Sequence, residues 1–77
     1  MVKFIGNWMF ANRLWNDSKP TPTVINLNEI TNINEFISDK LGRHVRISLK
    51  NNNDIPIAGD IIEVFAKFQE HLQAIEQ

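Results

Sequence analysis

The strongest candidate for binding chemistry is a row of polar and basic residues on one predicted strand. Between residues 44 and 50 they alternate with apolar residues, and they are His44, Arg46, Ser48 and Lys50. Strict alternation predicts a strand with one face on a core and the other in solvent or against a partner. Because Lys40 and Arg43 lie just upstream, we predict a basic strand face over residues 40–50. Such a face can follow a phosphate backbone or contact an acidic protein, although charges on a strand also serve simply to solvate it and to discourage edge pairing.

A group of aromatic residues near the N-terminus is the second candidate. Trp8, Phe10 and Trp15 occur close together, with Arg13 among them. Such residues can stack on the bases of single-stranded nucleic acid, or anchor a protein interface, where Trp and Arg are enriched. A domain this small needs its large side chains inside, so we predict that Trp8 and Phe10 lie in the core. Trp15 precedes a polar, proline-containing stretch and is expected to be partly exposed.

Acidic residues dominate the C-terminal part of the chain, which holds five acids and one lysine from Asp54 onward. Asp60 and Glu63 are spaced as a helix capping box, which places negative charge at a helix N-terminus. Glu63 and Glu70 are the candidate partner contacts here, with Asp60 and Glu76 beside them. An acidic helix of this kind could compete with nucleic acid for a basic groove on another protein.

Catalysis and metal binding have little support in the sequence. The chain has no phosphate-binding glycine loop, nucleophile elbow or HExxH motif, and no cysteine. His44 and His71 fall on different predicted elements, and no ligand spacing joins them to carboxylates. We therefore expect a protein that is not an enzyme and that binds no cofactor or metal.

Composition narrows the class of protein. The chain has 77 residues and a net charge of −1, which indicates one domain over residues 1–77 and argues against an overall basic nucleic-acid binder. It contains no apolar run of about 20 residues and no signal-peptide pattern, so we expect a soluble, cytoplasmic protein without membrane contact. Its ten Asn and eleven Ile suggest an AT-rich genome, as in many phages and mobile elements.

Turn residues and apolar periodicity predict the elements that position these side chains. Two apolar runs around Gly6-Asn7 favour a hairpin with a type II′ turn, with one long strand bent at Gly6 or a helix over residues 7–15 as alternatives. Residues 23–27 read as a short strand. Asn32 and Glu35 resemble a capping box, and the apolar positions behind them indicate a helix that ends at Gly42.

The last 18 residues form the clearest helical pattern. Their apolar stripe recurs at spacings of four and three, and it comprises Ile61, Phe65, Phe68, Leu72 and Ile75. The stripe matches a dimer seam over about two heptads, so a homodimer is conceivable, but its width favours packing on a sheet of the same chain. The fold class expected is α+β, in the order β(β)-β-α-β-α. It has an antiparallel or mixed sheet of three to four strands, with two helices packed on one face.

Two hypotheses for function follow. The first is a small non-enzymatic module that binds another protein, in its most specific form a phage or mobile-element inhibitor of a host enzyme that handles nucleic acid. The second is a protein that binds nucleic acid directly through the basic strand face.

Overall fold

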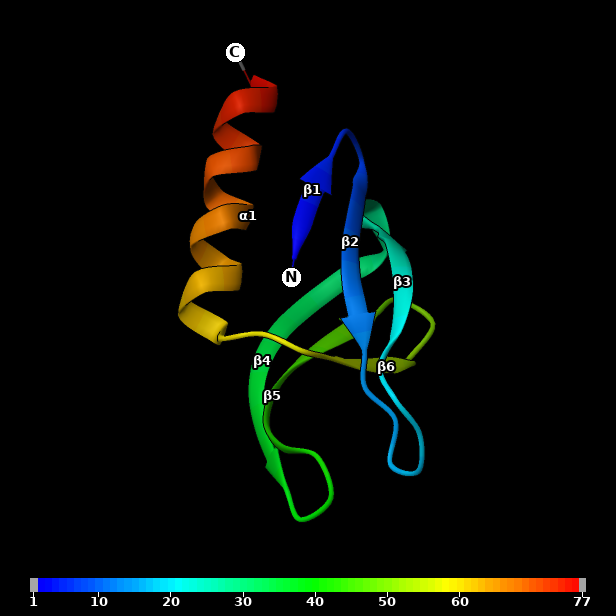
Figure 1. Cartoon of the computed structure of the whole chain (residues 1–77). Coiled ribbons are helices and arrows are strands. Elements are labelled where there is room, and N and C mark those ends of the chain that lie inside the picture. The colour runs from blue at the N-terminus through cyan, green and yellow to red at the C-terminus, as the bar shows by residue number, and fades with distance from the viewer. Residues whose placement is uncertain (1, 77) are drawn as a thin grey trace.

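The computed structural model describes residues 2–76 and contains six antiparallel strands and one C-terminal helix (Figure 1). The strands are β1 (Lys3–Ile5), β2 (Trp8–Arg13), β3 (Thr21–Asn26), β4 (Ile30–Ser38), β5 (Gly42–Leu49) and β6 (Asp54–Ile57). A 3-10 turn, η1 (Leu27–Glu29), precedes β4, and the helix is α1 (Ile61–Glu76). The prediction of three to four strands with two helices on one face is therefore wrong.

The N-terminal hairpin is confirmed. β1 pairs with β2 so that Ile5 lies opposite Trp8, across a two-residue turn. Gly6 has a φ of +56°, which is the positive value that the first turn position of a type II′ hairpin requires. The strand predicted over residues 23–27 is also present, but it begins two residues earlier and includes Pro22. β3 pairs only with β2 among the described residues, and an edge strand of this kind tolerates a proline.

The segment predicted as a helix over residues 33–41 is instead β4 and a hairpin turn. β4 and β5 pair from Ile30–Leu49 down to Ser38–Gly42. Gly42 has a φ of +68°, so the sequence signal for a left-handed glycine was read correctly. That conformation closes a three-residue β-hairpin with a bulge as well as it ends a helix. The β-branched residues of β4 favour the strand, because they pack well on a pleated surface.

β6 was not among the predicted strands, and it contains Pro56, which has no N–H to donate. Pro56 lies opposite Arg46 of β5, and its carbonyl accepts a hydrogen bond of 2.9 Å from the Leu14 N–H on the other side. The N and C=O of one strand residue point to the same side, so the missing N–H of Pro56 also faces away from β5. The proline therefore costs the β5–β6 ladder no hydrogen bond, and the strand forms.

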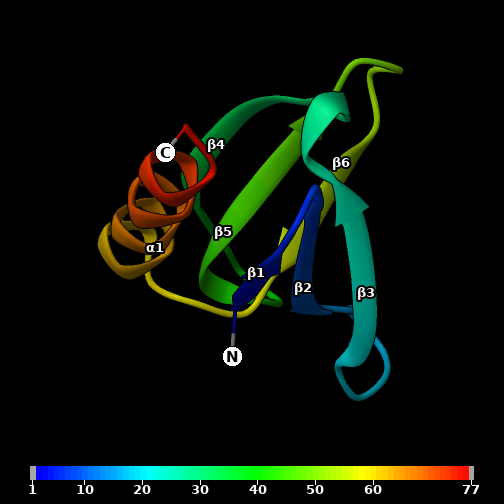
Figure 2. The ribbon, with the colours of Figure 1, turned by 90° about the horizontal axis from the view of Figure 1, so that it is seen from above.

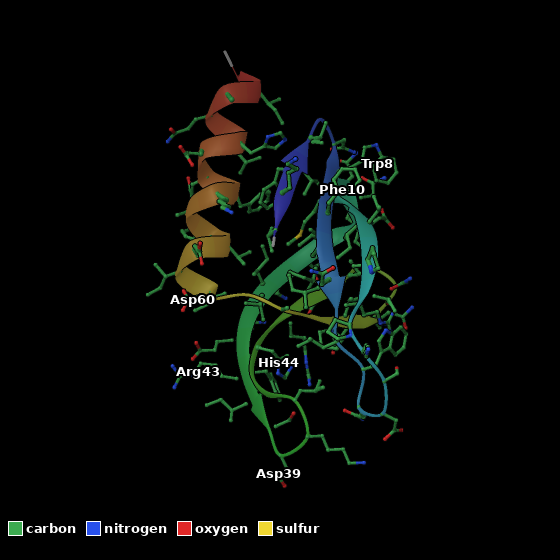
Figure 3. All side chains as sticks on the ribbon, in the orientation of Figure 1. Trp8, Phe10, Asp39, Arg43, His44 and Asp60 are labelled. Atoms are coloured by element: carbon green, nitrogen blue, oxygen red, sulfur yellow. The ribbon has the colours of Figure 1, made fainter. Side chains whose placement is uncertain are left out.

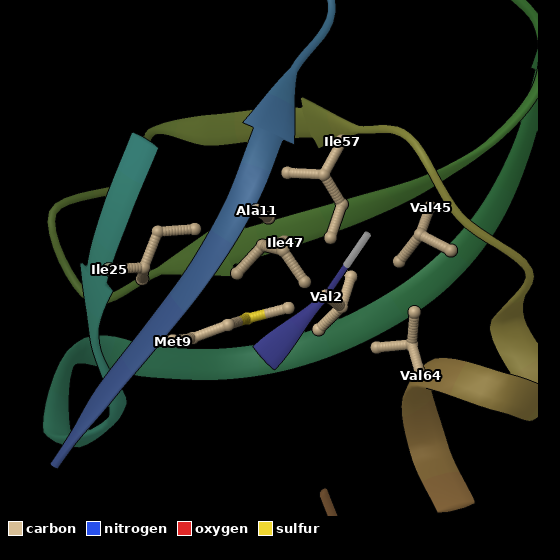
Figure 4. Packing of buried hydrophobic residues seen from close by; sticks show 8 residues of the cluster. All are labelled: Val2, Met9, Ala11, Ile25, Val45, Ile47, Ile57 and Val64. Atoms are coloured by element: carbon tan, nitrogen blue, oxygen red, sulfur yellow. The ribbon is translucent and has the colours of Figure 1, made fainter. Parts of the chain in front are cut away.

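The sheet curls strongly, and α1 lies beside the strands at its two ends, β1 and β4. The strand order is β1-β2-β6-β5-β4, with β3 on the other edge of β2. Figures 1 and 2 show α1 standing along the side of the sheet where β1 and β4 face it. The core lies inside the curl, and its buried apolar side chains are Val2, Met9, Ala11, Ile25, Val45, Ile47, Ile57 and Val64 (Figure 4).

The helix cap is confirmed, but the predicted helix face is only partly correct. Asp60 Oδ1 accepts hydrogen bonds from the N–H groups of Ile62 (2.9 Å) and Glu63 (3.2 Å). Val64 is the most buried helix residue at 1% exposure, whereas Phe65, in the predicted stripe, is 52% exposed. Because consecutive helix residues point about 100° apart, the helix sits rotated toward Val64 and leaves part of its apolar stripe uncovered.

Polar side chains fix this rotation at the free edge of β1. Lys67 Nζ donates to the Val2 carbonyl at 3.2 Å, and a ring nitrogen of His71 lies 2.6 Å from the Gly6 carbonyl. The His71 ring also stacks on Phe4 with ring centroids 5.6 Å apart. His71 is thus half-buried against β1, and its ring helps to cover an edge strand.

Candidate functional site

The basic strand face does not exist as a continuous surface. The strand itself is confirmed as β5, but His44 is only 1% exposed, and its Nδ1 lies 3.0 Å from the Gly42 carbonyl. Its ring faces that of Phe36 on β4, 6.2 Å away between centroids. The predicted alternation along the strand is confirmed. The prediction that His44 contacts solvent is wrong, because neighbouring side chains cover this end of β5.

The other predicted members of that face are dispersed. Arg46 is half-buried, with its guanidinium 3.5 Å from the centroid of the Phe36 ring and 3.9 Å from the Asp54 carboxylate. Ser48 is half-buried, whereas Lys50 lies in the turn after β5 and Lys40 in the turn before it, both exposed. Arg43 points to the face opposite His44, as Figure 3 shows. The structure therefore leaves no row of free cations along residues 40–50.

Arg13 and Trp15 do come together. The Arg13 guanidinium lies 4.2 Å from the centroid of the Trp15 ring, in cation–π geometry. Trp15 Nε1 donates to Thr21 Oγ1 at 2.8 Å, and Trp15 is partly exposed, as the sequence predicted. These contacts clip the end of β2 to the start of β3, so they have a structural role that is sufficient to explain both residues.

Trp8 and Phe10 do not lie in the core, contrary to prediction. Trp8 is 47% exposed and Phe10 is half-buried, and both project from the side of β2 away from α1 (Figure 3). The interior positions of β2 are taken by Met9 and Ala11. A strongly curled sheet leaves little room inside, and a flexible thioether and a methyl group fill that space better than two aromatic rings.

These two aromatic residues belong to a contiguous apolar surface on three strands. Ile5 lies opposite Trp8 on β1, and Val24 lies opposite Phe10 on β3. Ile5 is 55% exposed and Val24 is 52% exposed. Paired residues on one side of a sheet are in contact range, as are residues two apart on one strand. We call this surface the outer apolar face, and its members are Ile5, Trp8, Phe10 and Val24.

Hydrogen bonds hold the rim of the outer apolar face in place. Asn7 Nδ2 donates to Asn26 Oδ1 at 2.7 Å, and the same oxygen accepts from the Asn28 N–H at 2.9 Å. The Leu27 N–H donates to the Asn7 carbonyl at 2.9 Å. The β1–β2 turn is thereby tied to the end of β3, opposite the Arg13–Trp15 clip. A surface fixed at both ends loses little entropy when a partner docks on it.

A signal for this face was present in the sequence. In a hairpin with a two-residue turn at Gly6-Asn7, Lys3 falls on the same side as Ile5, Trp8 and Phe10. A charged residue at that register position marks the solvent side, and Val2, Phe4, Met9 and Ala11 are left for the interior. The position of Lys3 therefore indicates an exposed side for Trp8 and Phe10, whereas the expectation that a small core needs large side chains placed both of them inside.

The acidic candidates on α1 are exposed. Glu63 and Glu70 are seven residues apart, so they lie on the same side of the helix. The one ion pair found among the side chains of residues 2–75 joins Arg46 to Asp54; Lys67 lies between the two glutamates on the same side of the helix, and its Nζ donates to the Val2 carbonyl. The described part of the chain also contains no group of three or more potential metal ligands.

Comparisons of the chain with protein-family models, curated protein sequences and solved structures find no match. Within residues 2–76 no helix has both the length and the apolar character needed to cross a bilayer.

Proposed function

We propose that the protein is a small non-enzymatic module that binds another protein through the outer apolar face. The observation that carries this proposal is the contiguity of Ile5, Trp8, Phe10 and Val24 across three strands. Single exposed apolar residues are normal, but a connected apolar patch on a small domain is a cue to an interface. Aromatic residues at the centre of such a patch are the usual energetic anchors, and Trp is the most enriched of them.

Charge supports a specific class of partner. Glu63 and Glu70 are exposed on one side of α1 and have no ion-pair partner among the described residues. A partner with a basic surface would meet them favourably and would be steered toward the protein. In this version the partner is an enzyme that handles nucleic acid, and the acidic helix attracts its basic groove from outside the contact made by the outer apolar face.

Affinity capture with matched variants tests the proposal. Trp8→Ser removes the central anchor of the outer apolar face. Ile62→Ser removes an equally apolar side chain from α1, where Ile62 stands exposed outside that face. We expect the wild type and Ile62→Ser to retain the same partner and Trp8→Ser to lose it by tenfold or more, as for a hot-spot residue. Equal retention by Trp8→Ser would contradict the proposal, provided that circular dichroism finds all three folded.

The acidic version has its own test. Glu63→Gln and Glu70→Gln together keep the shape of α1 but remove two of its negative charges. We expect this double variant to bind the captured partner more slowly, with a weaker dependence on salt, because charges outside the contact area act mainly on the association rate. An unchanged association rate at low salt would show that the acidic helix does not steer the partner.

Direct binding of nucleic acid is the second candidate function, and one observation favours it. Trp8 and Phe10 project from one side of β2, with Lys3 opposite Phe10, which is a possible platform for stacked bases beside a phosphate contact. Titration of the tryptophan fluorescence with single-stranded oligonucleotides at low and physiological salt tests it. Saturable quenching that weakens with salt would support this function, whereas a flat titration together with unchanged anisotropy of a labelled oligonucleotide would exclude it.

A further inference from the structure

Besides the outer apolar face, one edge of β4 has no partner among the described strands. β4 pairs with β5 along one edge, and no strand among residues 2–76 pairs with the other. An unpaired strand edge presents a row of backbone N–H and C=O groups, and the matching ligand for such a row is another extended chain.

The hydrogen-bond pattern identifies which residues of β4 present those groups. The Leu49 N–H donates to Asn53, on the β6 side, while the Lys50 N–H donates to Glu29, just before β4. Alternation along β5 then directs the backbone of Ser48, Arg46 and His44 toward β4. Their partners on β4 are Asn32, Asn34 and Phe36.

The intervening residues Ile33, Glu35 and Ile37 therefore point their backbone groups at the free edge. Their side chains share the face of β4 that continues into the core, where Ile33 packs against the buried cluster. A strand added at this edge would place alternate side chains on the same face.

A groove between β4 and α1 is available to receive those side chains. It is lined by residues 30–33 of β4 and by Phe65 and Phe68 of α1. The rotation of α1 toward Val64 leaves Phe65 half exposed, so the groove has an aromatic wall that the chain itself does not cover. Beyond the groove Ile37 is 66% exposed, and it extends the apolar surface along the edge.

Glu35 sets the charge of the occupant. It is exposed between Ile33 and Ile37 on the same face, where Arg43 of β5, which is paired with Ile37, is its diagonal neighbour, and the ion pair found among the described residues involves neither of the two charges. Opposite charges across two strands are stabilising and like charges are destabilising. A guest strand that fits this edge therefore carries a basic residue opposite Glu35, with an apolar residue two positions away on each side.

We propose that the β4 edge and the groove beside it bind an extended segment of another protein by strand addition. The segment has the pattern apolar, any, basic, any, apolar, in which the first or last apolar residue contacts Phe65. This site is separate from the outer apolar face and does not depend on it. A second copy of the chain fits less well, because the symmetric pairing that sets Ile33 opposite Ile37 also sets Glu35 opposite the same residue of the other copy.

Peptide titration tests the site on the full chain. The probe is an acetylated, amidated peptide, Thr-Val-Thr-Arg-Thr-Val-Thr, and the control peptide has Glu in place of Arg. We expect the Arg peptide to shift the NMR amide signals of residues 33–37 and to slow hydrogen exchange at Ile33, Glu35 and Ile37. Hydrogen exchange at Asn32 and Asn34 should change little, because their N–H groups already face β5. Absence of these changes at millimolar peptide would overturn the proposal.

Reversal of the charge at residue 35 is the decisive control. Glu35→Lys should weaken the Arg peptide about fivefold and strengthen the Glu peptide by a similar factor, as expected for one cross-strand charge pair. Phe65→Ser should weaken both peptides, whereas Val24→Thr, on the outer apolar face, should leave both unchanged. Binding that ignores the charge at residue 35 would refute the assigned register. Concentration-dependent protection of the Glu35 amide without peptide would instead show that a second copy occupies the edge, which also overturns the proposal.

Discussion

Two consecutive residues of β3 test whether the outer apolar face is correctly placed. Val24 is 52% exposed on that face, whereas Ile25 is 3% exposed in the core. Thr is β-branched like both residues, so Val24→Thr and Ile25→Thr preserve strand propensity and differ mainly in which side of the sheet receives a hydroxyl.

The burial of each side chain sets the expected cost. Ile25→Thr replaces a buried ethyl group by a hydroxyl, which loses roughly 1.6 kcal/mol of apolar transfer at about 0.8 kcal/mol per methylene. A buried hydroxyl without a new partner adds about 1–3 kcal/mol. We therefore expect Ile25→Thr to lower the free energy of unfolding by about 2.5–4.5 kcal/mol. Val24→Thr replaces one half-exposed methyl group and should cost about 0.5 kcal/mol or less.

Urea unfolding followed by far-UV circular dichroism and by tryptophan fluorescence measures both values. A domain of this size has a total stability of about 4–12 kcal/mol, so Ile25→Thr should move the midpoint by an amount that is easily resolved at a slope of about 1 kcal/mol/M. Equal costs, or a larger cost for Val24→Thr, would refute the placement. A register shift of one residue would exchange the two faces and produce that result.

Three further predictions concern the β4–β5 turn and the helix α1. Gly42→Ala should destabilise the chain by about 1–2 kcal/mol, because residue 42 adopts a positive φ in the β4–β5 turn, and Gly42→Asn should cost less, as thermal unfolding can measure. Asp60→Ala should cost about 0.5–2 kcal/mol and Asp60→Ser much less, because Asp60 Oδ1 caps α1; equal losses in urea titrations would argue against the cap. Val64→Asn should be far more destabilising than Phe65→Asn in the same titrations, because the first change alone buries an amide, and the reverse order would contradict the rotation of α1.

Local signals in the sequence predicted the parts of the fold that they determine. Gly6 predicted a two-residue hairpin turn, Asp60 predicted the start of the last helix, and the alternation around Ile47 predicted a strand. Each signal depends on a few neighbouring residues and needs no knowledge of the remaining chain.

Some sequence patterns fit both a helix and a β-hairpin, and contacts with the rest of the chain decide which one forms. Asn32 and Glu35 match a helix cap, and Gly42 matches a helix end, yet the same residues suit a β-hairpin. The competing cue was the run of β-branched residues in β4, which favours a strand that has a partner to pair with. That partner is β5, the strand that the alternation around Ile47 predicts, and pairing with it decides between the two structures.

Whether a side chain is buried or exposed depends on residues that lie far from it in the sequence. The burial of His44 depends on packing beside Phe36 of the neighbouring strand, and the exposure of Trp8 depends on how tightly the sheet curls around Met9. Periodicity assigns side chains to two faces of a strand, but it does not say which face the rest of the chain covers. The binding candidates were therefore less predictable than the strands that carry them.

Photo-crosslinking from the outer apolar face tests the central claim most directly. The photoreactive residue p-benzoylphenylalanine is introduced at position 24, and at position 62 as a control, and each protein is irradiated in lysate of the source organism. We predict a single protein adduct of defined mass from position 24 that disappears when Trp8→Ser is added and does not form from position 62. No protein adduct from position 24, or the same adduct from both positions, would contradict the claim that this face binds a partner.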